Sequence, residues 1–461
     1  MPDVAPEGSA PGSRLARSSM VAFGIHVGGA GLSYCVQMLL ARAVGADGFG
    51  LYAYVLAWMT MLAYLAMLGS DVLLLRFIPA YRAQGAWTLL RGVIRHAERW
   101  AALVGGAVVL VGIAAARLWG SARSPDLANT FIAGLFLVPI LALLWIRASV
   151  VRAFGGVASA LAPDRVARDC LLLGFVGFAV LALGWRIDAL DAMLATVLSA
   201  ALGLALVSFA KRRWMPQMAH AAQPASDGST WAKAALPLAA IGVAGVVVNR
   251  TGVVLLGWSG MITQAGAYAL AFNVAFLVVL PRTAINALFA PVISNLFVRQ
   301  DMAALQALAT KASVWSLLGA ACIALPLAVF ADVLLGWFGP GFDAGAPALR
   351  LLLLGQVVAA AAGSQLSLLT MTGHERAAAA LMLANLIVNA AMGAALIHFL
   401  GLVGAAIGAT ASLVLWNVAM GFLVRRSLNL VPSAFAAFRA PSARRARIAQ
   451  PQLALRPSMP P

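Results

Sequence analysis

ALPLAAIGVAGVVVNRTGVVLLGW, residues 235–258, is the stretch that decides the fold of this protein. It is long enough to cross a bilayer as a helix, which needs about 20 mostly apolar residues. Its only charged residue is Arg250, which follows Asn249 inside the apolar run. A charged side chain within a membrane is costly unless it faces a cavity or a partner. The stretch therefore predicts a membrane helix that carries a polar site.

Apolar runs of this kind fill the rest of the chain, in which 62% of the 461 residues are hydrophobic and 10% are charged. The runs do not alternate as barrel strands do. The first lacks an A-x-A-like cleavage site and is too long for a signal peptide. We predict an all-α polytopic membrane protein with about twelve transmembrane helices. The predicted spans are residues 19–40, 51–70, 99–119, 128–146, 169–185, 189–210, 234–257, 265–288, 313–336, 347–371, 377–398 and 402–424.

The formal net charge is +17, and most of the Lys and Arg residues lie in the connections between the predicted spans. The connections expected on the same side of the membrane as the N-terminus carry fifteen Lys and Arg residues, and those on the opposite side carry five. Loops rich in Lys and Arg remain in the cytoplasm. The basic charge is therefore better explained by the orientation of a bacterial inner-membrane protein than by nucleic-acid binding. The same pattern predicts that both termini are cytoplasmic.

The two halves of the chain resemble each other at an offset of 216 residues. FGLYAYVLAW, from Phe49, aligns with AGAYALAFNV, from Ala265, so that Gly50 matches Gly266 and Tyr52 matches Tyr268. Transporters often place their binding site between such repeats, near the middle of the membrane. Chance similarity between Ala/Leu-rich helices is the alternative. The predicted organisation is an N-terminal tail (1–18), a six-helix bundle (19–210), a cytoplasmic linker (211–233), a second six-helix bundle (234–424) and a basic cytoplasmic tail (425–461).

Polar side chains within the spans are the candidate binding residues, and most of them fall in the second half. They are Gln37, Asn249, Arg250, Asn273, Arg282, Asn286, Gln356, Gln365, Asn385 and Asn389. Arg250 has no acidic residue in its own span, and a guanidinium there suits an anionic group such as a diphosphate. Snorkelling to the headgroups is the alternative for Arg250 and equally for Arg282.

The sequence offers no evident carboxylate that could couple transport to an ion gradient, because no Asp or Glu falls in the central part of a predicted span. Coupling to protons or sodium commonly uses such a group. His26 is the candidate that remains, although a lone His beside glycines is also a common packing residue. The membrane potential is another source of drive, since moving one charge across 100 mV changes the free energy by about 2.3 kcal/mol. The three cysteines match no metal motif, so we expect no metal, cofactor or catalytic residue.

Several stretches together carry a family resemblance: LLARAVGADGFGLYAYVLAW (39–58), NRTGVVLLG (249–257), FGPGFDAGAPALRLLLLGQ (338–356) and TGHERAAAALMLANLIVNAAM (372–392). In their order and spacing the chain resembles the polysaccharide-biosynthesis (O-antigen type) flippases of the multidrug/oligosaccharidyl-lipid/polysaccharide (MOP) exporter superfamily. The resemblance covers residues 19–426. It implies two six-helix bundles around a V-shaped cavity, with alternating access.

The implied substrate is an undecaprenyl-diphosphate-linked oligosaccharide that moves from the cytoplasmic to the periplasmic leaflet. The resemblance implies roles for Asp71 and Arg76, and for Asn249, Arg250 and Thr251. Family members often have an acidic residue next, where this chain has Gly252. Arg282 likewise stands where the family usually has an apolar residue.

A cation-coupled drug or metabolite antiporter of the same superfamily is the alternative function. A polymerase or glycosyltransferase is disfavoured, because the longest periplasmic connection is about ten residues and carries few acids. We expect a monomer that contacts membrane lipids, binds no nucleic acid and works with the glycosyltransferases of a polysaccharide pathway.

Overall fold

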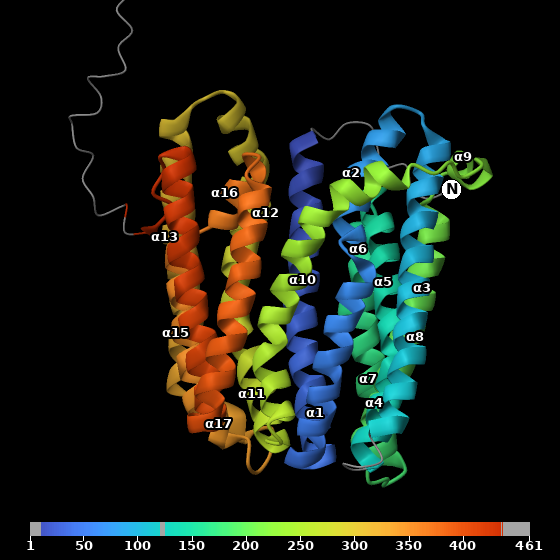
Figure 1. Ribbon diagram of the computed structural model, residues 1–461, viewed down its shortest axis with the longest axis vertical. Coiled ribbons are helices and arrows are strands. Elements are labelled where there is room, and N and C mark those ends of the chain that lie inside the picture. Colours follow the sequence, from blue (N-terminus) through green and yellow to red (C-terminus); the bar gives the residue numbers. More distant parts are fainter. Residues whose placement is uncertain (1–10, 120–124, 435, 437–461) are drawn as a thin grey trace, which may run out of the picture.

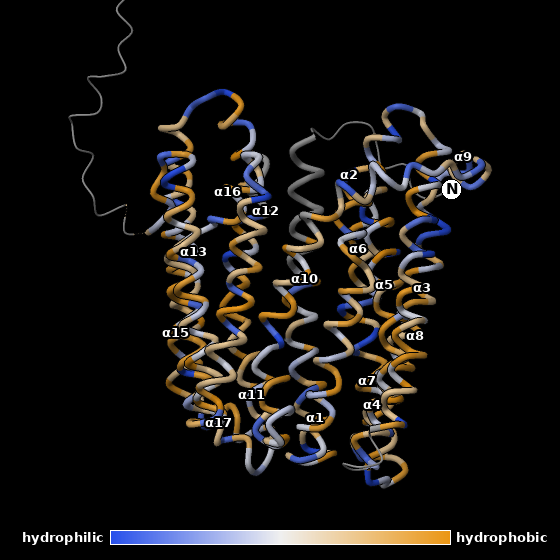
Figure 2. Tube along the Cα trace, in the orientation of Figure 1, coloured by the Kyte–Doolittle hydropathy of each residue, from blue (hydrophilic) through white to orange (hydrophobic). Residues whose placement is uncertain are grey.

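The computed structural model describes residues 11–119, 125–434 and 436, and within these ranges every regular element is a helix. Most of the helices run along the long axis of the molecule (Figure 1). Apolar residues cover much of their length (Figure 2). In the described part of the chain, nine helical segments are long and apolar enough to cross a membrane. The protein is therefore an all-α, multi-pass membrane protein.

The first half of the chain forms the helices on one side of Figure 1. Their bounds are α1 (Pro11–Met67), α2 (Ser70–Ala83), α3 (Trp87–Trp119), α4 (Pro125–Leu135), α5 (Leu137–Ala153), α6 (Val157–Ala162), η2 (Pro163–Ala167), α7 (Arg168–Gly177), η3 (Phe178–Ala182) and α8 (Ala189–Trp214).

The second half follows the short helix α9 (Gln217–Ala221). Its helices are α10 (Gly228–Trp258), α11 (Ile262–Phe276), η4 (Leu277–Val279), α12 (Leu280–Val298), α13 (Met302–Val329), α14 (Ala331–Gly336), η5 (Asp343–Gly345), α15 (Ala346–Ala362), α16 (Gln365–Met371) and α17 (Glu375–Leu428).

Two of the long helices each contain a turn at a glycine. Gly45 in α1 has φ 76° and Gly401 in α17 has φ 53°, and both are non-helical. A positive φ suits glycine because it has no Cβ. The turn at Gly401 is held by the Gln264 side chain, whose Oε1 accepts a hydrogen bond from the Leu402 N–H at 2.9 Å.

One predicted span is wrong at its start. The span predicted at residues 169–185 begins instead at Val157 and runs through α6, η2, α7 and η3 to Ala182. Pro163 begins the π-helix η2, which continues from α6 into α7, so the proline does not end the helical segment. Asp164 and Asp169 consequently lie inside a continuous helix, whereas the prediction left Asp164 outside the span and Asp169 at its first residue.

The predicted tenth span is also too long. The helix predicted at residues 347–371 ends at Ala362, because Gly363 has φ 79°. Gln365 therefore begins the separate short helix α16.

The segment between the halves packs on the first half. The Ala225 N–H donates to the Thr88 carbonyl at 3.1 Å, and the Trp231 Nε1–H donates to the Tyr81 hydroxyl at 2.9 Å. Trp231 is 1% exposed. The beginning of α10 is thus anchored to α2 and α3.

The two halves approach each other closely where the sequence repeat aligns them. A Cβ built on Gly50 would lie 2.2 Å from the Ile262 carbonyl oxygen, and one on Gly266 would lie 2.8 Å from the Gly50 Cα. The Thr263 hydroxyl donates to the Asp47 carboxylate, and these positions too are 216 residues apart. Residues related by a two-fold axis meet only near that axis, so the contact supports true repetition of the halves.

Hydrogen bonds between the first half and the helices after α10 concentrate at the end of the molecule that holds Gly45. Between the described residues before Lys211 and those after Trp258, every hydrogen bond uses a side chain from Tyr34 to Asp47. Arg42 Nε, for example, donates to the Trp337 carbonyl at 2.7 Å, and the Phe49 ring meets the Phe342 ring edge to face. We call this the closed end.

Gly50→Ala tests the glycine contact. We expect a loss of about 1–3 kcal/mol of stability, because the added methyl group overpacks a backbone carbonyl. Thermal unfolding of the purified protein measures the loss. Gly31→Ala is the matched control, since a Cβ on Gly31 meets no atom within 4 Å. Equal melting temperatures for the two variants would contradict the contact.

Candidate functional site

Arg250 lies on the side of α10 that faces the first half. Its guanidinium is close enough to the Tyr52 and Tyr64 hydroxyls of α1 to interact with them electrostatically. On the neighbouring face, Gly252 accommodates the Tyr268 ring of α11, because a Cβ there would lie 2.4 Å from that ring. Arg250 is partly buried and forms no hydrogen bond or ion pair with any residue that the structure describes. It is an uncompensated charge between the halves.

A side-chain hydrogen bond joins the halves beside this site. Asn273 Nδ2 of α11 donates to Gln37 Oε1 of α1 at 2.7 Å. Gln37 Nε2 donates to Ser33 Oγ at 3.4 Å, and Ser33 lies near the Asp169 carboxylate. A chain of polar contacts thus runs from the second half into the first.

That chain ends in an ion cluster within the first half. Arg168 Nη1 lies 2.9 Å from Asp164 Oδ1, and Arg168 Nε lies 3.3 Å from Asp169 Oδ1. The Asp169 side chain is 8% exposed. Tyr52, which is near Arg250, also interacts electrostatically with Arg168 and Asp169. The first half therefore carries intramembrane charges that the sequence prediction did not include.

The spacing of these residues could have revealed the cluster. Asp164 and Arg168 are separated by four positions, which places them on one face of a helix. Pro163 and the neighbouring charges instead suggested a polar connection between two spans.

His26 and Asp71 both lie near Arg152 in the first half. Both interact electrostatically with Arg152 of α5, and His26 also interacts with Arg165 and Asp164. Asp71 stands in the first turn of α2, where a carboxylate suits the helix dipole. Arg152 Nε is buried with no hydrogen-bond partner among the described residues.

The other candidate residues are not gathered at this site. Arg76 and Asn249 are exposed, and Arg282 and Gln356 are partly buried. None of these four side chains has a hydrogen bond or ion pair to a described residue. Asn286 and Ser364 are hydrogen-bonded to each other, and Asn389 Nδ2 donates to Ser412 Oγ at 2.7 Å. These amides join helices of the second half.

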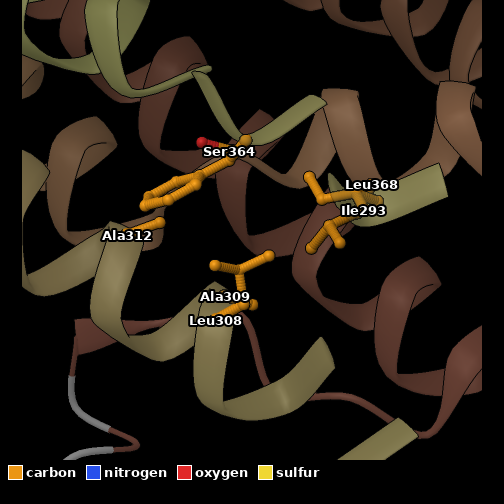
Figure 3. A pocket seen from close by; sticks show the side chains of 7 residues that line it. Ile293, Leu308, Ala309, Ala312, Ser364 and Leu368 are labelled. Carbon is orange, nitrogen blue, oxygen red and sulfur yellow. The ribbon is translucent and has the colours of Figure 1, made fainter. Parts of the chain in front are cut away.

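A small cavity lies between α12, α13 and α16 and is shown in Figure 3. Its volume is about 10 Å³, room for a single water at most. The lining is apolar except for Ser364. This cavity is a gap in helix packing and is too small for a sugar.

Metal binding finds no support in the described residues, where no three His, Cys, Asp or Glu side chains gather. Cys35, Cys170 and Cys322 are exposed and unpaired with one another.

Comparison with known proteins identifies both a family and a fold. A family model described as polysaccharide biosynthesis protein matches residues 15–297, more than half of the chain. Comparison with curated proteins finds no match.

Solved MOP transporters share the fold. An inward-facing multidrug resistance MATE family transporter of the MOP superfamily superposes with a TM-score of 0.70 at 13% identity, over 92% of this chain and 100% of that one. An outward-facing MATE structure gives 0.65 at 15% identity, over 91% and 96%. A MOP superfamily transporter from Pyrococcus furiosus, described with a binding pocket of reverse polarity, gives 0.64 at 15% identity, over 93% and 99%.

Arg168→Leu tests the ion cluster. We expect a loss of about 3 kcal/mol, because removal of one partner leaves buried carboxylates uncompensated. Asp169→Asn in the same chain should restore part of the melting temperature. Arg165→Leu is the control, since Arg165 is 55% exposed and 3.8 Å from Asp164. Equal losses from both Arg substitutions would show that the cluster does not stabilise the bundle.

Proposed function

Because the chain belongs to the family of polysaccharide biosynthesis proteins, we propose that it flips an undecaprenyl-diphosphate-linked oligosaccharide from the cytoplasmic to the periplasmic leaflet. The family resemblance seen in the sequence is confirmed. Family and fold are those of transporters and not of an enzyme. The observation that carries the proposal is the uncompensated guanidinium of Arg250 between the two halves.

The chemistry of Arg250 favours a diphosphate. A guanidinium remains charged at any physiological pH and presents paired N–H donors that match two phosphate oxygens. Inside a membrane, such a charge is tolerable when it faces a water-filled space or an anion. A passing diphosphate would supply the missing negative charge, whereas the sugar and the polyprenyl chain would not.

Alternating access is supported by the difference between the two ends. The hydrogen bonds at the closed end each contribute about 1 kcal/mol net, so hydration can replace them when that end opens. At the opposite end, α10 is the helix of the second half that contacts the first half, through Trp231 and Tyr81, and no hydrogen bond joins described residues before Lys211 to those after Trp258. We infer that the structure corresponds to a state open to the cytoplasm, with a V-shaped cavity between the halves.

Twelve crossings and an inner-membrane location complete the proposal. The turns at Gly45 and Gly401 divide two of the nine segments, and the helix from Val157 to Ala182 adds one more. These three additions give twelve crossings in two bundles of six. The basic connections lie opposite the closed end, and the positive-inside rule supports a cytoplasmic location for both termini.

A cation-coupled antiporter is the second candidate, and the ion cluster is the observation that favours it. Asp164 and Asp169 supply the carboxylates that the sequence analysis had not found in a span. Both carboxylates are already paired with Arg168, however. A substrate cation would therefore have to compete with a positive charge that belongs to the protein itself. The pocket polarity reported for the Pyrococcus furiosus transporter accords with a fold that serves different substrates.

Substitution of Arg250 tests the flippase. In proteoliposomes that contain a fluorescent polyprenyl-diphosphate disaccharide, the rate at which the probe becomes accessible to a membrane-impermeant quencher measures flipping. We expect Arg250→Ala to slow this rate about 10- to 100-fold, since charge-assisted hydrogen bonds contribute about 1.5–3 kcal/mol. Arg250→Lys should retain part of the rate, because an ammonium cannot bind two oxygens in the same way.

Arg186→Ala is the control for loss of one positive charge, since Arg186 is exposed. An unchanged rate in correctly inserted Arg250→Ala would remove Arg250 from the proposed site. Transport of a cationic dye, with no flipping of the disaccharide probe, would favour the antiporter instead.

Cross-linking at the closed end tests alternating access. Asp47→Cys and Thr263→Cys are introduced into a chain whose Cys35, Cys170 and Cys322 are replaced by Ser. A short bifunctional methanethiosulfonate should join them, because the native side chains are in contact. We expect flipping to stop and a reductant to restore it. Either single cysteine serves as the control, and full flipping by the cross-linked protein would contradict the mechanism.

A further inference from the structure

A pocket of about 400 Å³ lies in the first half, where α3, α5 and α8 end near α9. Its charged lining consists of Arg91, Arg95, Glu98, Arg147, Lys211 and Arg212. Five basic side chains therefore face a single carboxylate. Figure 1 shows α9 beside the end of α3, and Figure 2 shows hydrophilic residues gathered there.

The hydrogen bonds within the pocket hold it open but do not neutralise it. Glu98 Oε1 accepts hydrogen bonds from Arg147 Nε at 2.9 Å and from Lys211 Nζ at 2.7 Å. This one carboxylate links three helices and is shared between two cations. Arg91 Nη1 donates to the Ala222 carbonyl at 2.6 Å and thereby positions the segment after α9.

Arg95 and Arg212 supply the available charge. Both side chains are exposed, and neither has a hydrogen bond or ion pair with a residue that the structure describes. Basic residues at the cytoplasmic end of membrane helices, within a pocket between helices, are the chemistry that binds phosphate headgroups. Arginine is particularly suited to paired contacts with phosphate oxygens.

The surroundings of the pocket favour a lipid over a soluble anion. Further along the same helices, Leu103 of α3 is 71% exposed and Phe209 of α8 is 68% exposed, in segments apolar enough to span the membrane. Trp100 and Trp214, also exposed, stand beside the pocket at the level expected for interfacial aromatic residues. A ligand with a phosphate and acyl chains would satisfy both surfaces at once.

We propose that this pocket binds the phosphate headgroup of an anionic phospholipid, with the acyl chains against the exposed faces of α3 and α8. The lipid bridges three helices of the first half and so stabilises that bundle. The site is separate from Arg250, which lies between the halves. The proposal does not depend on the transported substrate.

The test measures lipid binding to the full-length protein in detergent. Phosphatidylglycerol should raise the melting temperature and remain bound in native mass spectrometry, and phosphatidylcholine should do neither. The Arg95→Gln/Arg212→Gln variant should bind phosphatidylglycerol about 30-fold more weakly, because each of the two lost Arg residues would weaken binding to the headgroup by a similar factor. Glu98→Gln should bind it more tightly, since the pocket then gains net positive charge.

Arg76→Gln/Arg82→Gln is the matched control, because it removes the same charge from exposed residues of α2 outside the pocket. Equal binding of the two phospholipids, or equal losses from the two double variants, would overturn the proposal. Stabilisation by inorganic phosphate alone that matches phosphatidylglycerol would identify a soluble-anion site and would also overturn it. Flipping of the disaccharide probe is a separate readout, so failure here leaves the proposed function untouched.

Discussion

The close approach of Gly50 and Gly266 is the constraint on which the rest of the structure depends. With no side chain between them, the backbones of α1 and α11 come near enough for Asp47 to reach Thr263 and for Gln37 to reach Asn273. Small residues drive such helix contacts in lipid, where no hydrophobic effect pulls helices together. One end of the molecule is thereby closed, and the polar side chains of both halves are turned toward each other.

Within that frame, the protein treats buried charge in two different ways. Arg168 is held by Asp164 and Asp169, so its charge is balanced inside the first half. Arg250 stands close to tyrosine hydroxyls but has no ionic partner among the described residues. A balanced cluster stabilises a bundle, whereas an unbalanced charge is a cost unless a ligand or water offsets it. This contrast is the physical reason to assign binding to Arg250 and structure to Arg168.

The polar contacts from Asn273 through Gln37 and Ser33 to Asp169 connect these two regions. A change in the separation of the halves would break the Gln37–Asn273 bond, since it crosses between them. The ion cluster would then gain or lose a hydrogen-bonded neighbour. The basic pocket around Glu98 lies apart from this series of contacts, among α3, α5 and α8 of the first half.

The sequence alone indicates that the chain is a multi-pass helical membrane protein, because apolar runs of sufficient length have no other stable arrangement in lipid. It also identified Arg250, whose charge stands out against its apolar neighbours, and the repeat that aligns Gly50 with Gly266. Only the tertiary structure decided that residues 157–182 form one helix, because Asp164, Arg168 and Asp169 are tolerable there through pairing that depends on three-dimensional position. It alone brought Gln37 to Asn273 and gathered Arg91, Glu98, Arg147 and Lys211 into one pocket. Hydropathy is a property of neighbours along the chain, whereas the balance of buried charge is a property of neighbours in space.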